Sequence, residues 1–291
     1  MEITANAVKE LREKTGAGMM DCKKALAETM GDFDKAVVWL REKGVAQVAK
    51  RSGRSADQGI IGSYVQSGKV GVLVEVNCET DFVAKTDDFQ NLVKELATQV
   101  AEEKNEKAVL LDLPYKNDPK KTVGQRVTEV AAKVGENLVV RRSVRLQLGA
   151  ADQGVIGSYV HSGKVGVLVE IHSKTESAAK NEDFVNLAKE LAMQVAASAP
   201  KYVSREEVPA AEIEQEKAIY LAEAKQSGKP EAVQQKIAEG KIESYYKQVC
   251  LVDQPYIREP KKSVKQYVAE VAAKVGETVV VRRFSRLQLG E

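Results

Sequence analysis

The first candidates for chemistry are two segments, rich in glycine and lysine, that resemble a phosphate-binding loop. In Gly62–Lys69, five residues separate Gly62 from Gly68. A phosphate loop has four there, followed by Lys and then a Ser or Thr that binds magnesium, where this chain has Val70. The same segment recurs at Gly157–Val165. Because Ser67-Gly68 between two apolar runs is a hairpin signal, we interpret both segments as β-hairpins and expect no direct nucleotide binding.

Metal ligands and nucleophiles are sparse. The chain has two histidines, His161 and His172, and three cysteines, Cys22, Cys78 and Cys250, none of them paired at the spacing of a zinc site. Aspartates and glutamates are scattered over polar helix faces, where they are usually solvated. We therefore expect no metal site, no cofactor and no covalent catalysis, so the protein is not expected to be an enzyme.

Asp81 and Phe82 lie between an apolar segment, Val70–Val76, which indicates a buried strand, and a helical pattern that begins near Asp87. A large aromatic side chain in such a turn is unusual, because aromatic residues normally belong to the core. Phe82 either folds back under its own helix, which is the commoner arrangement, or is presented to a groove on a partner protein.

An internal duplication bears on this choice. The segment Asp57–Glu75 recurs almost letter for letter at Asp152–Glu170, 95 residues later. At the same offset Thr80–Lys85 corresponds to Thr175–Lys180, in which Glu176 replaces Asp81 and Ser177 replaces Phe82. If Phe82 only packed against its own helix, the second copy should also need an apolar group. The comparison therefore favours a role outside the fold.

Two long motifs, Thr80–Val83 and Leu11–Leu26, resemble the elongation factor Ts family, and the resemblance covers the whole chain. It implies a guanine-nucleotide exchange factor that binds elongation factor Tu, a GTP-binding protein, and promotes GDP release in translation elongation. It also implies which residues of this chain contact the partner. Thr80, Asp81, Phe82 and Val83 would bind beside the partner's magnesium site, and Arg12, Met19, Met20 and Lys23 would contact the partner's GTP-binding domain. His161 would make a weaker contact with the partner's third domain.

The residues of the N-terminal motif support two interpretations. Methionine is a common core filler, so Met19 and Met20 could both be packing groups. Neighbouring positions on a helix point in different directions, however, so we expect one of the two to be exposed. An exposed methionine beside Arg12 and Lys23 suits a contact surface for a partner.

Composition restricts the alternatives. The 291 residues carry 30% charged side chains but a net charge of only +2, which argues against a dedicated nucleic-acid-binding protein. The alternative function is a non-catalytic scaffold that holds proteins together or binds RNA through strand arginines, namely Arg141, Arg145, Arg282 and Arg286.

No apolar run approaches the roughly 20 residues of a membrane helix. With three unpaired cysteines and no targeting signal, we expect a cytoplasmic protein that binds no membrane.

The elements that position these residues indicate an α+β fold. For residues 1–55 the sequence predicts a three-helix module that resembles a ubiquitin-associated domain. The last part of this range, Lys50–Ser55, is expected to be a basic linker. Residues 56–149 predict a first core subdomain in the order strand, strand, helix, helix, strand, which favours a three-stranded antiparallel sheet with helices. Residues 150–291 predict a second copy.

The second copy contains an insertion. Val123–Leu148 matches Val264–Leu289 at an offset of 141 rather than 95, so residues have been added between the two matching parts. We place the insertion at about residues 201–250. Apolar residues recur there every three or four positions on both sides of Ser227–Pro230, which predicts a helical hairpin that turns at those four residues.

Overall fold

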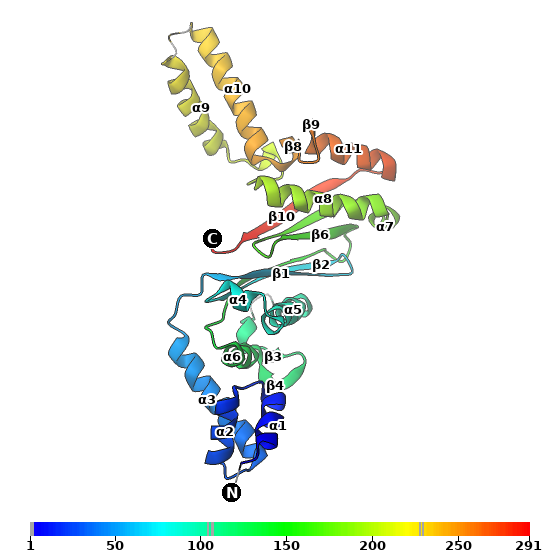
Figure 1. The fold of residues 1–291 in the computed structure, drawn as a ribbon. Helices are drawn as coiled ribbons and strands as arrows, with labels where there is room; N and C mark the ends of the chain where they lie inside the picture. Colours follow the sequence, from blue (N-terminus) through cyan, green and yellow to red (C-terminus); the bar gives the residue numbers. More distant parts are fainter. Residues whose placement is uncertain (1–2, 104, 106–107, 227, 229) are drawn as a thin grey trace. The chain divides into compact units, whose positions relative to one another are not determined.

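The computed structural model describes residues 3–103, 105, 108–226, 228 and 230–291 (Figure 1). The fold is α+β, as the sequence predicts, with helices and small three-stranded sheets in the predicted order. The chain divides into two compact units. The first comprises the residues up to Gly62, Val74–Ser143 and Leu289–Glu291, and the second comprises Ser63–Leu73 and Val144–Gln288.

The predicted three-helix module consists of α1 (Ala5–Thr15), α2 (Met19–Glu28) and α3 (Phe33–Arg51). The Thr4 side chain caps α1 by accepting a hydrogen bond from the Ala7 backbone N–H, and Gly16 ends the helix at a φ of 69°. The three helices bury a common core of Val8, Leu11, Cys22, Ala25, Leu26 and Ala36.

Helix α3 is longer than the sequence suggests. It continues through Arg51, so it includes the first two residues of the segment expected to be a linker. It packs on α6 (Val123–Val134) of the first core subdomain. A Cβ atom added to Gly44 would lie 3.0 Å from the Ala132 Cβ, so the glycine allows the two helices to approach closely. The helical module is therefore packed against the subdomain that follows it.

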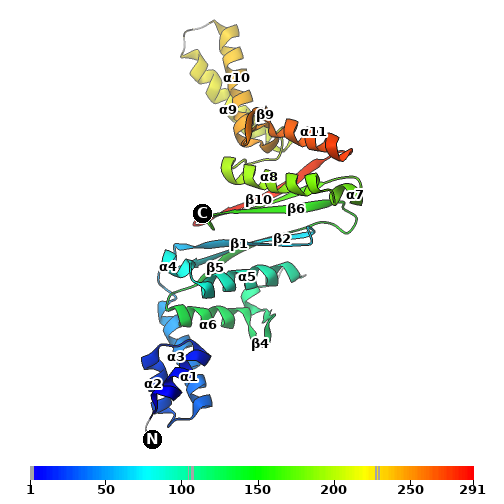
Figure 2. The ribbon, with the colours of Figure 1, turned by 45° about the vertical axis from the view of Figure 1, so that its right-hand side comes forward.

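The first core subdomain contains a sheet in the order β1-β2-β5. Its hairpin turns at Ser67 and Gly68, which both have positive φ, as the sequence predicts. Helix α5 buries one stripe of apolar residues, and Figure 2 shows α5 and α6 on the same side of the strands. The remaining bounds are β1 Gln58–Gln66, β2 Val70–Cys78, α4 Asp81–Ala84, α5 Asp87–Glu102, η1 Leu110–Asp112, β3 Pro114–Tyr115, β4 Asp118–Thr122 and β5 Val139–Gln147.

The second core subdomain repeats this plan. Its sheet has the order β10-β7-β6, and both ladders are antiparallel. Helix α8 covers this sheet, α11 packs on α8, and the three layers enclose a core in which Phe184, Leu187 and Leu191 are fully buried. The bounds are β6 Gly154–His161, β7 Val165–His172, α7 Glu176–Ala179, α8 Glu182–Ser198, η2 Arg205–Glu207, η3 Leu251–Asp253, β8 Pro255–Tyr256, β9 Glu259–Ser263, α11 Val264–Val275 and β10 Val280–Gln288.

The inserted segment forms the predicted helical hairpin of α9 (Ala210–Lys225) and α10 (Glu231–Val249), which lie side by side in Figure 1. Ser227 and Lys229 of the predicted turn lie outside the described residues. Charged groups fix the base of the hairpin. The Arg205 guanidinium donates to both Glu243 and Asp253 at 2.9 Å, and the Glu212 carboxylate accepts from the hydroxyls of Tyr202 and Tyr245.

Candidate functional site

Residues Thr80–Val83, called the Phe82 turn below, connect β2 to α5. Thr80 is the N-cap of the four-residue helix α4, and its hydroxyl accepts a hydrogen bond from the Val83 backbone N–H at 3.3 Å. The Cys78 thiol donates to the Thr80 carbonyl at 3.1 Å. Local hydrogen bonds thus bend the chain directly after the buried strand.

The carboxylate of Glu136 holds the start of this turn. It accepts hydrogen bonds from the backbone N–H groups of Glu79 and Thr80, both at 3.0 Å, and from the Thr80 hydroxyl at 2.6 Å. Glu136 directly follows Gly135, the residue with positive φ that ends α6. Hydrogen bonds to a charged group contribute about 1.5–3 kcal/mol each. Glu136 is therefore a strong positioning residue.

Glu79 links the turn to the chain that leaves α3. Its carboxylate accepts from the Asn137 backbone N–H at 2.7 Å and forms an ion pair with Arg54 at 3.4 Å. The Asn137 side-chain amide donates to the Arg54 carbonyl at 2.9 Å. The Phe82 turn is therefore connected both to the end of α6 and to the segment after the helical module.

Phe82 is exposed. Its side chain has 78% of its surface accessible, whereas the following residues, Val83 and Ala84, point inward with 9% and 5%. The alternative in which Phe82 packs under its own helix is therefore wrong, because Val83 and Ala84 occupy the inner face of α4. Asp81 is also exposed and forms an ion pair with Lys85 at 2.8 Å. Of the four residues in the turn, Asp81 and Phe82 present their side chains to solvent.

The second copy has the same framework without the aromatic group. The Thr175 hydroxyl accepts from the Ala178 N–H at 3.3 Å and donates to Glu277 at 2.5 Å, as Thr80 does with Val83 and Glu136. Glu176 pairs with Lys180 at 2.8 Å. The exposed position after it is Ser177. The backbone geometry is thus common to both copies, and Phe82 is specific to the first.

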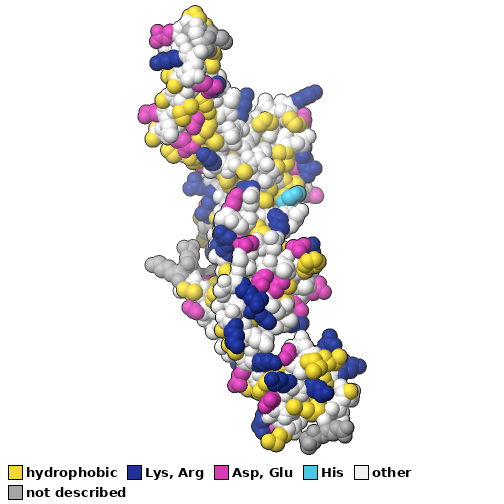
Figure 3. All heavy atoms as spheres, turned by 60° about the vertical axis from the view of Figure 1, so that its left-hand side comes forward, with side chains coloured by type: hydrophobic (Ala, Val, Ile, Leu, Met, Phe, Trp, Pro, Cys, Tyr) yellow, Lys and Arg dark blue, Asp and Glu magenta, His cyan; other side chains and the backbone are white. Residues whose placement is uncertain are grey.

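The four residues predicted as contacts in the helical module are all exposed on α1 and α2. Met19 and Met20 are 53% and 75% accessible, so both methionines are exposed where the sequence analysis expected one. The reason is that α2 begins at Met19 and turns Cys22, Ala25 and Leu26 to the core. Figure 3 shows hydrophobic side chains among lysine and arginine side chains at this end of the molecule.

His161 belongs to the second unit and ends β6. It is exposed, and its Nδ1 atom lies 3.0 Å from the Tyr159 hydroxyl. No group of three or more metal-ligating side chains occurs among the described residues, and no described helix is long and apolar enough to cross a membrane. The loop-like segment Gly62–Lys69 leads from β1 into β2 rather than into a helix, as the hairpin interpretation predicts.

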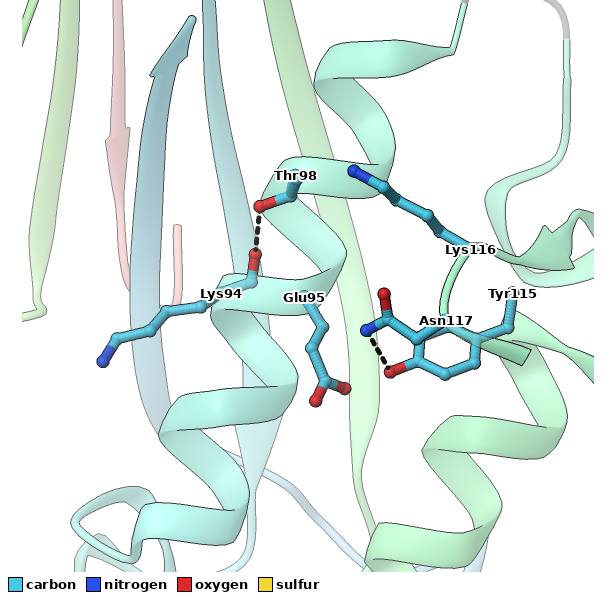
Figure 4. Close-up of a pocket in the computed structure, with 6 residues that line it drawn as sticks. All are labelled: Lys94, Glu95, Thr98, Tyr115, Lys116 and Asn117. Atoms are coloured by element: carbon cyan, nitrogen blue, oxygen red, sulfur yellow. Dashed lines mark hydrogen bonds between the residues drawn. The ribbon is translucent and has the colours of Figure 1, made fainter. Parts of the chain in front are cut away.

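A shallow polar hollow of about 260 Å³ lies between α5 and the β3–β4 turn (Figure 4). Asn117 donates to the Tyr115 hydroxyl at 2.9 Å, and Arg126 makes a two-pronged contact with Glu95 at 3.0 and 3.2 Å. Burial raises the pKa of the Tyr115 phenol. Since Glu95 and Tyr115 are engaged with their neighbours, these contacts stabilise the fold and do not form a reactive group.

A family model described as "Elongation factor TS" matches residues 79–291. An elongation factor Ts from Nostoc sp. (strain PCC 7120) is 48% identical over 293 residues, covering 100% of this chain and 93% of the relative. One from Lawsonia intracellularis is 43% identical and covers 100% of both chains. One from Clostridium botulinum (strain Eklund 17B) is 45% identical over 99% of this chain.

Proposed function

The chain belongs to the elongation factor Ts family, and from that premise we propose that it is a guanine-nucleotide exchange factor for elongation factor Tu. In this proposal the protein binds no nucleotide and changes no covalent bond. It binds the GTP-binding protein beside its magnesium site and disturbs the magnesium and the phosphates, so that GDP is released during translation elongation.

The observation that carries the proposal is the exposure of Phe82 on a turn held by Glu136. An aromatic group that is 78% accessible in the free protein contributes little to its fold and is available to a partner's pocket. Its replacement by Ser177 on an otherwise equivalent turn argues that the fold does not require it.

The mechanism follows from reciprocity between two ligands of one protein. If this chain weakens GDP binding by some factor, GDP weakens the binding of this chain by the same factor. The complex of all three components is then a strained intermediate from which either GDP or the exchange factor leaves. Burying one Phe side chain yields about 1.5–3 kcal/mol, so that contact alone cannot supply a large acceleration. Other contacts must hold the Phe82 turn in place.

We assign that anchoring to Arg12, Met19, Met20 and Lys23 and, more weakly, to His161. All five side chains are exposed. The packing of α3 on α6 favours this division of roles, because it ties the helical module to the subdomain that carries the Phe82 turn. Force applied to the turn by the partner can then be resisted by contacts made through α1 and α2.

The alternative is a scaffold that binds proteins or RNA without accelerating GDP release. For the RNA version, Arg141 is engaged within the chain: its side chain lies 4.0 Å from the Glu75 carboxylate and donates to the Glu291 carbonyl at 2.9 Å. That engagement reduces what Arg141 offers to phosphates.

Release of a fluorescent GDP analogue from elongation factor Tu, followed with and without this protein, separates the two functions. The exchange-factor proposal predicts that release accelerates with protein concentration and saturates. Complex formation with an unchanged release rate would contradict it and support the scaffold. A parallel titration with single-stranded RNA tests the RNA version, for which we expect no saturable binding at physiological salt.

A further inference from the structure

The internal duplication separates two kinds of contact around the Phe82 turn. One kind is common to both copies: the Thr80 hydroxyl donates to Glu136 in the first, and the Thr175 hydroxyl donates to Glu277 in the second. These contacts support the turn whether or not it carries an aromatic residue. The other kind involves residues that differ between the copies, so it belongs to what the first copy alone does.

Asn137 is the centre of the contacts that are specific to the first copy. Its side chain is buried, with 4% of its surface accessible. The side-chain amide donates to the carbonyls of Ser52 and Arg54 at 3.4 and 2.9 Å, and the backbone N–H donates to the Glu79 carboxylate at 2.7 Å. The same carboxylate pairs with Arg54 at 3.4 Å. One buried residue thus joins the chain that leaves α3 to the residue directly before the Phe82 turn.

The second copy replaces all three side chains of this connection. At the offsets of 95 and 141, Arg54 corresponds to Gly149, Glu79 to Lys174 and Asn137 to Thr278. A glycine has no side chain to form an ion pair, and a lysine ammonium cannot accept a hydrogen bond. Thr278 is also exposed, whereas Asn137 is buried. Since the helical module precedes the first copy, the connection occurs in the copy to which the module is joined.

Asn137 holds α3 at a second point. Near the middle of α3, Gly44 lies against Ala132 of α6. Ser52 follows Gly44 by eight positions, which corresponds to about 12 Å along a helix. A second attachment at that distance resists rotation of α3 about its crossing point with α6. The hydrogen bonds of Asn137 therefore fix the orientation of the helical module relative to the Phe82 turn.

The proposed exchange activity gives this fixed orientation a function. If the anchoring residues on α1 and α2 and the Phe82 turn moved independently, each could bind the partner in its own relaxed position. The partner's nucleotide site would then be disturbed less, and by reciprocity GDP would expel this chain less. A rigid connection makes the two contacts act on the partner as one body.

We propose that Asn137 is a positioning residue for GDP release, which couples the helical module to the Phe82 turn. In this role it contacts neither the nucleotide nor the partner and acts through Ser52, Arg54 and Glu79. The inference rests on the proposed exchange function, because its effect is read in how strongly GDP and this chain exclude each other from elongation factor Tu.

The test is the ratio of two affinities of this chain, one for nucleotide-free elongation factor Tu and one for its GDP-bound form. Both are measured by titrating the labelled chain, once with partner stripped of nucleotide and once in excess GDP. We expect Asn137→Thr to lower the ratio about fivefold, because an ordinary hydrogen bond corresponds to a factor of that order. The maximal rate of GDP release should also fall several-fold.

A purely structural role predicts a different result. An unfolded fraction lowers the amount of protein that binds in both titrations alike and leaves the ratio of the two affinities unchanged. If Asn137→Thr does not fold, Asn137→Asp keeps the volume, loses both donor hydrogens and should lower the ratio in the same way. Thr278→Asn, at the exposed equivalent position, is the matched control and should leave the ratio at its wild-type value.

A wild-type affinity ratio in a folded Asn137 variant would overturn this inference and leave the exchange function intact. An equal fall in the ratio for Thr278→Asn would overturn it as well, since that residue lies in the second copy. Wild-type protein that binds both forms of the partner equally and does not accelerate GDP release would instead overturn the proposed exchange function, and this inference with it.

Discussion

A few neighbouring residues determine whether the Phe82 side chain is exposed to solvent or buried in the fold. Val83 and Ala84 occupy the inner face of α4, and Glu136 holds the backbone before it through three hydrogen bonds. Glu277 makes two of the equivalent contacts, with the Lys174 backbone N–H and the Thr175 hydroxyl, on the turn that carries Ser177. The two glutamates therefore form a matched pair in which the same chemistry supports the turn that carries Phe82 in one copy and the turn that carries Ser177 in the other.

Replacing Glu136 with Gln should slow GDP release several-fold, because a neutral amide holds the backbone N–H groups less firmly and the Phe82 turn loses its fixed position. The cost in stability should be about 1–2 kcal/mol. Glu277→Gln should cost a similar amount of stability and leave release within twofold of the wild-type rate. Release rates and thermal unfolding of both variants check this, and equal slowing by the two substitutions would count against a special role of the first turn.

At the level of elements, the base of the α9–α10 hairpin combines a small apolar cluster of Val208, Tyr245, Val249 and Cys250 with the charged carboxylate of Glu212. Hydrogen bonds from the Tyr202 and Tyr245 hydroxyls lower the pKa of the Glu212 carboxyl from its ordinary value of 4.5. A carboxyl whose pKa is lower in the folded than in the unfolded protein stabilises the fold above the unfolded pKa. That contribution is lost as the pH falls through the folded value.

We therefore expect Glu212→Gln to lower the melting temperature at pH 7 and to have progressively less effect as the pH is reduced below 4.5. The neighbouring substitution Glu214→Gln, at an exposed position of α9, is the control and should have little effect at either pH. Thermal unfolding between pH 3 and pH 7 measures the difference. A constant gap between wild type and Glu212→Gln across this range would show that the ionised carboxylate is not the stabilising form.

Some helices and strands can be predicted from the sequence, and others cannot. The duplication, the Ser67-Gly68 hairpin and the inserted helices are predictable because they depend on local turn residues and apolar periodicity. The β3–β4 ladder is not, since Leu113-Pro114 and Asp118-Pro119 indicate breaks and β3 has only two residues. The packing of α3 on α6 is not predictable either, because it brings Gly44 close to Ala132, which lies far along the chain.

In the candidate site, too, features set by local residues are predictable from the sequence, and features set by distant contacts are not. The sequence identified Phe82 through its replacement in the second copy but left its exposure open, because exposure depends on which neighbours fill the inner face of the turn. It missed Glu136, whose contacts join residues more than fifty positions apart. A signal was present: Glu136 and Glu277 recur at the offset of 141 and both follow a glycine that ends a helix.

At the scale of the whole molecule, we propose that different parts of the chain anchor the partner and disturb its nucleotide site. In our proposal the exposed groups on α1 and α2 anchor the partner, and the Phe82 turn disturbs the partner's nucleotide site. Deleting the helical module would be a poor test of this division, because it would also uncover the α6 surface on which α3 packs. Surface substitutions that leave α3 in place avoid that difficulty.

The double substitution Arg12→Glu with Met20→Asp should weaken binding to elongation factor Tu about tenfold or more, because both side chains are exposed and belong to the proposed anchor. At saturating concentration the release rate should stay within about twofold of wild type. Met30→Asp, which alters another exposed methionine, is the control. Titrations of the release rate separate the two quantities, and a lower plateau with unchanged half-saturation would contradict the division of roles.

The proposed role of Phe82 is tested by the rate of GDP release from elongation factor Tu at saturating concentrations of the Phe82→Ala variant, with Ser177→Ala as the matched control. Because Phe82 is exposed, its truncation should change the free energy of unfolding by no more than about 0.5 kcal/mol. We expect that the Phe82→Ala variant still binds elongation factor Tu but that GDP release is about tenfold slower, since about 1.4 kcal/mol is tenfold, while Ser177→Ala matches wild type. Wild-type release by a folded Phe82→Ala variant would contradict it.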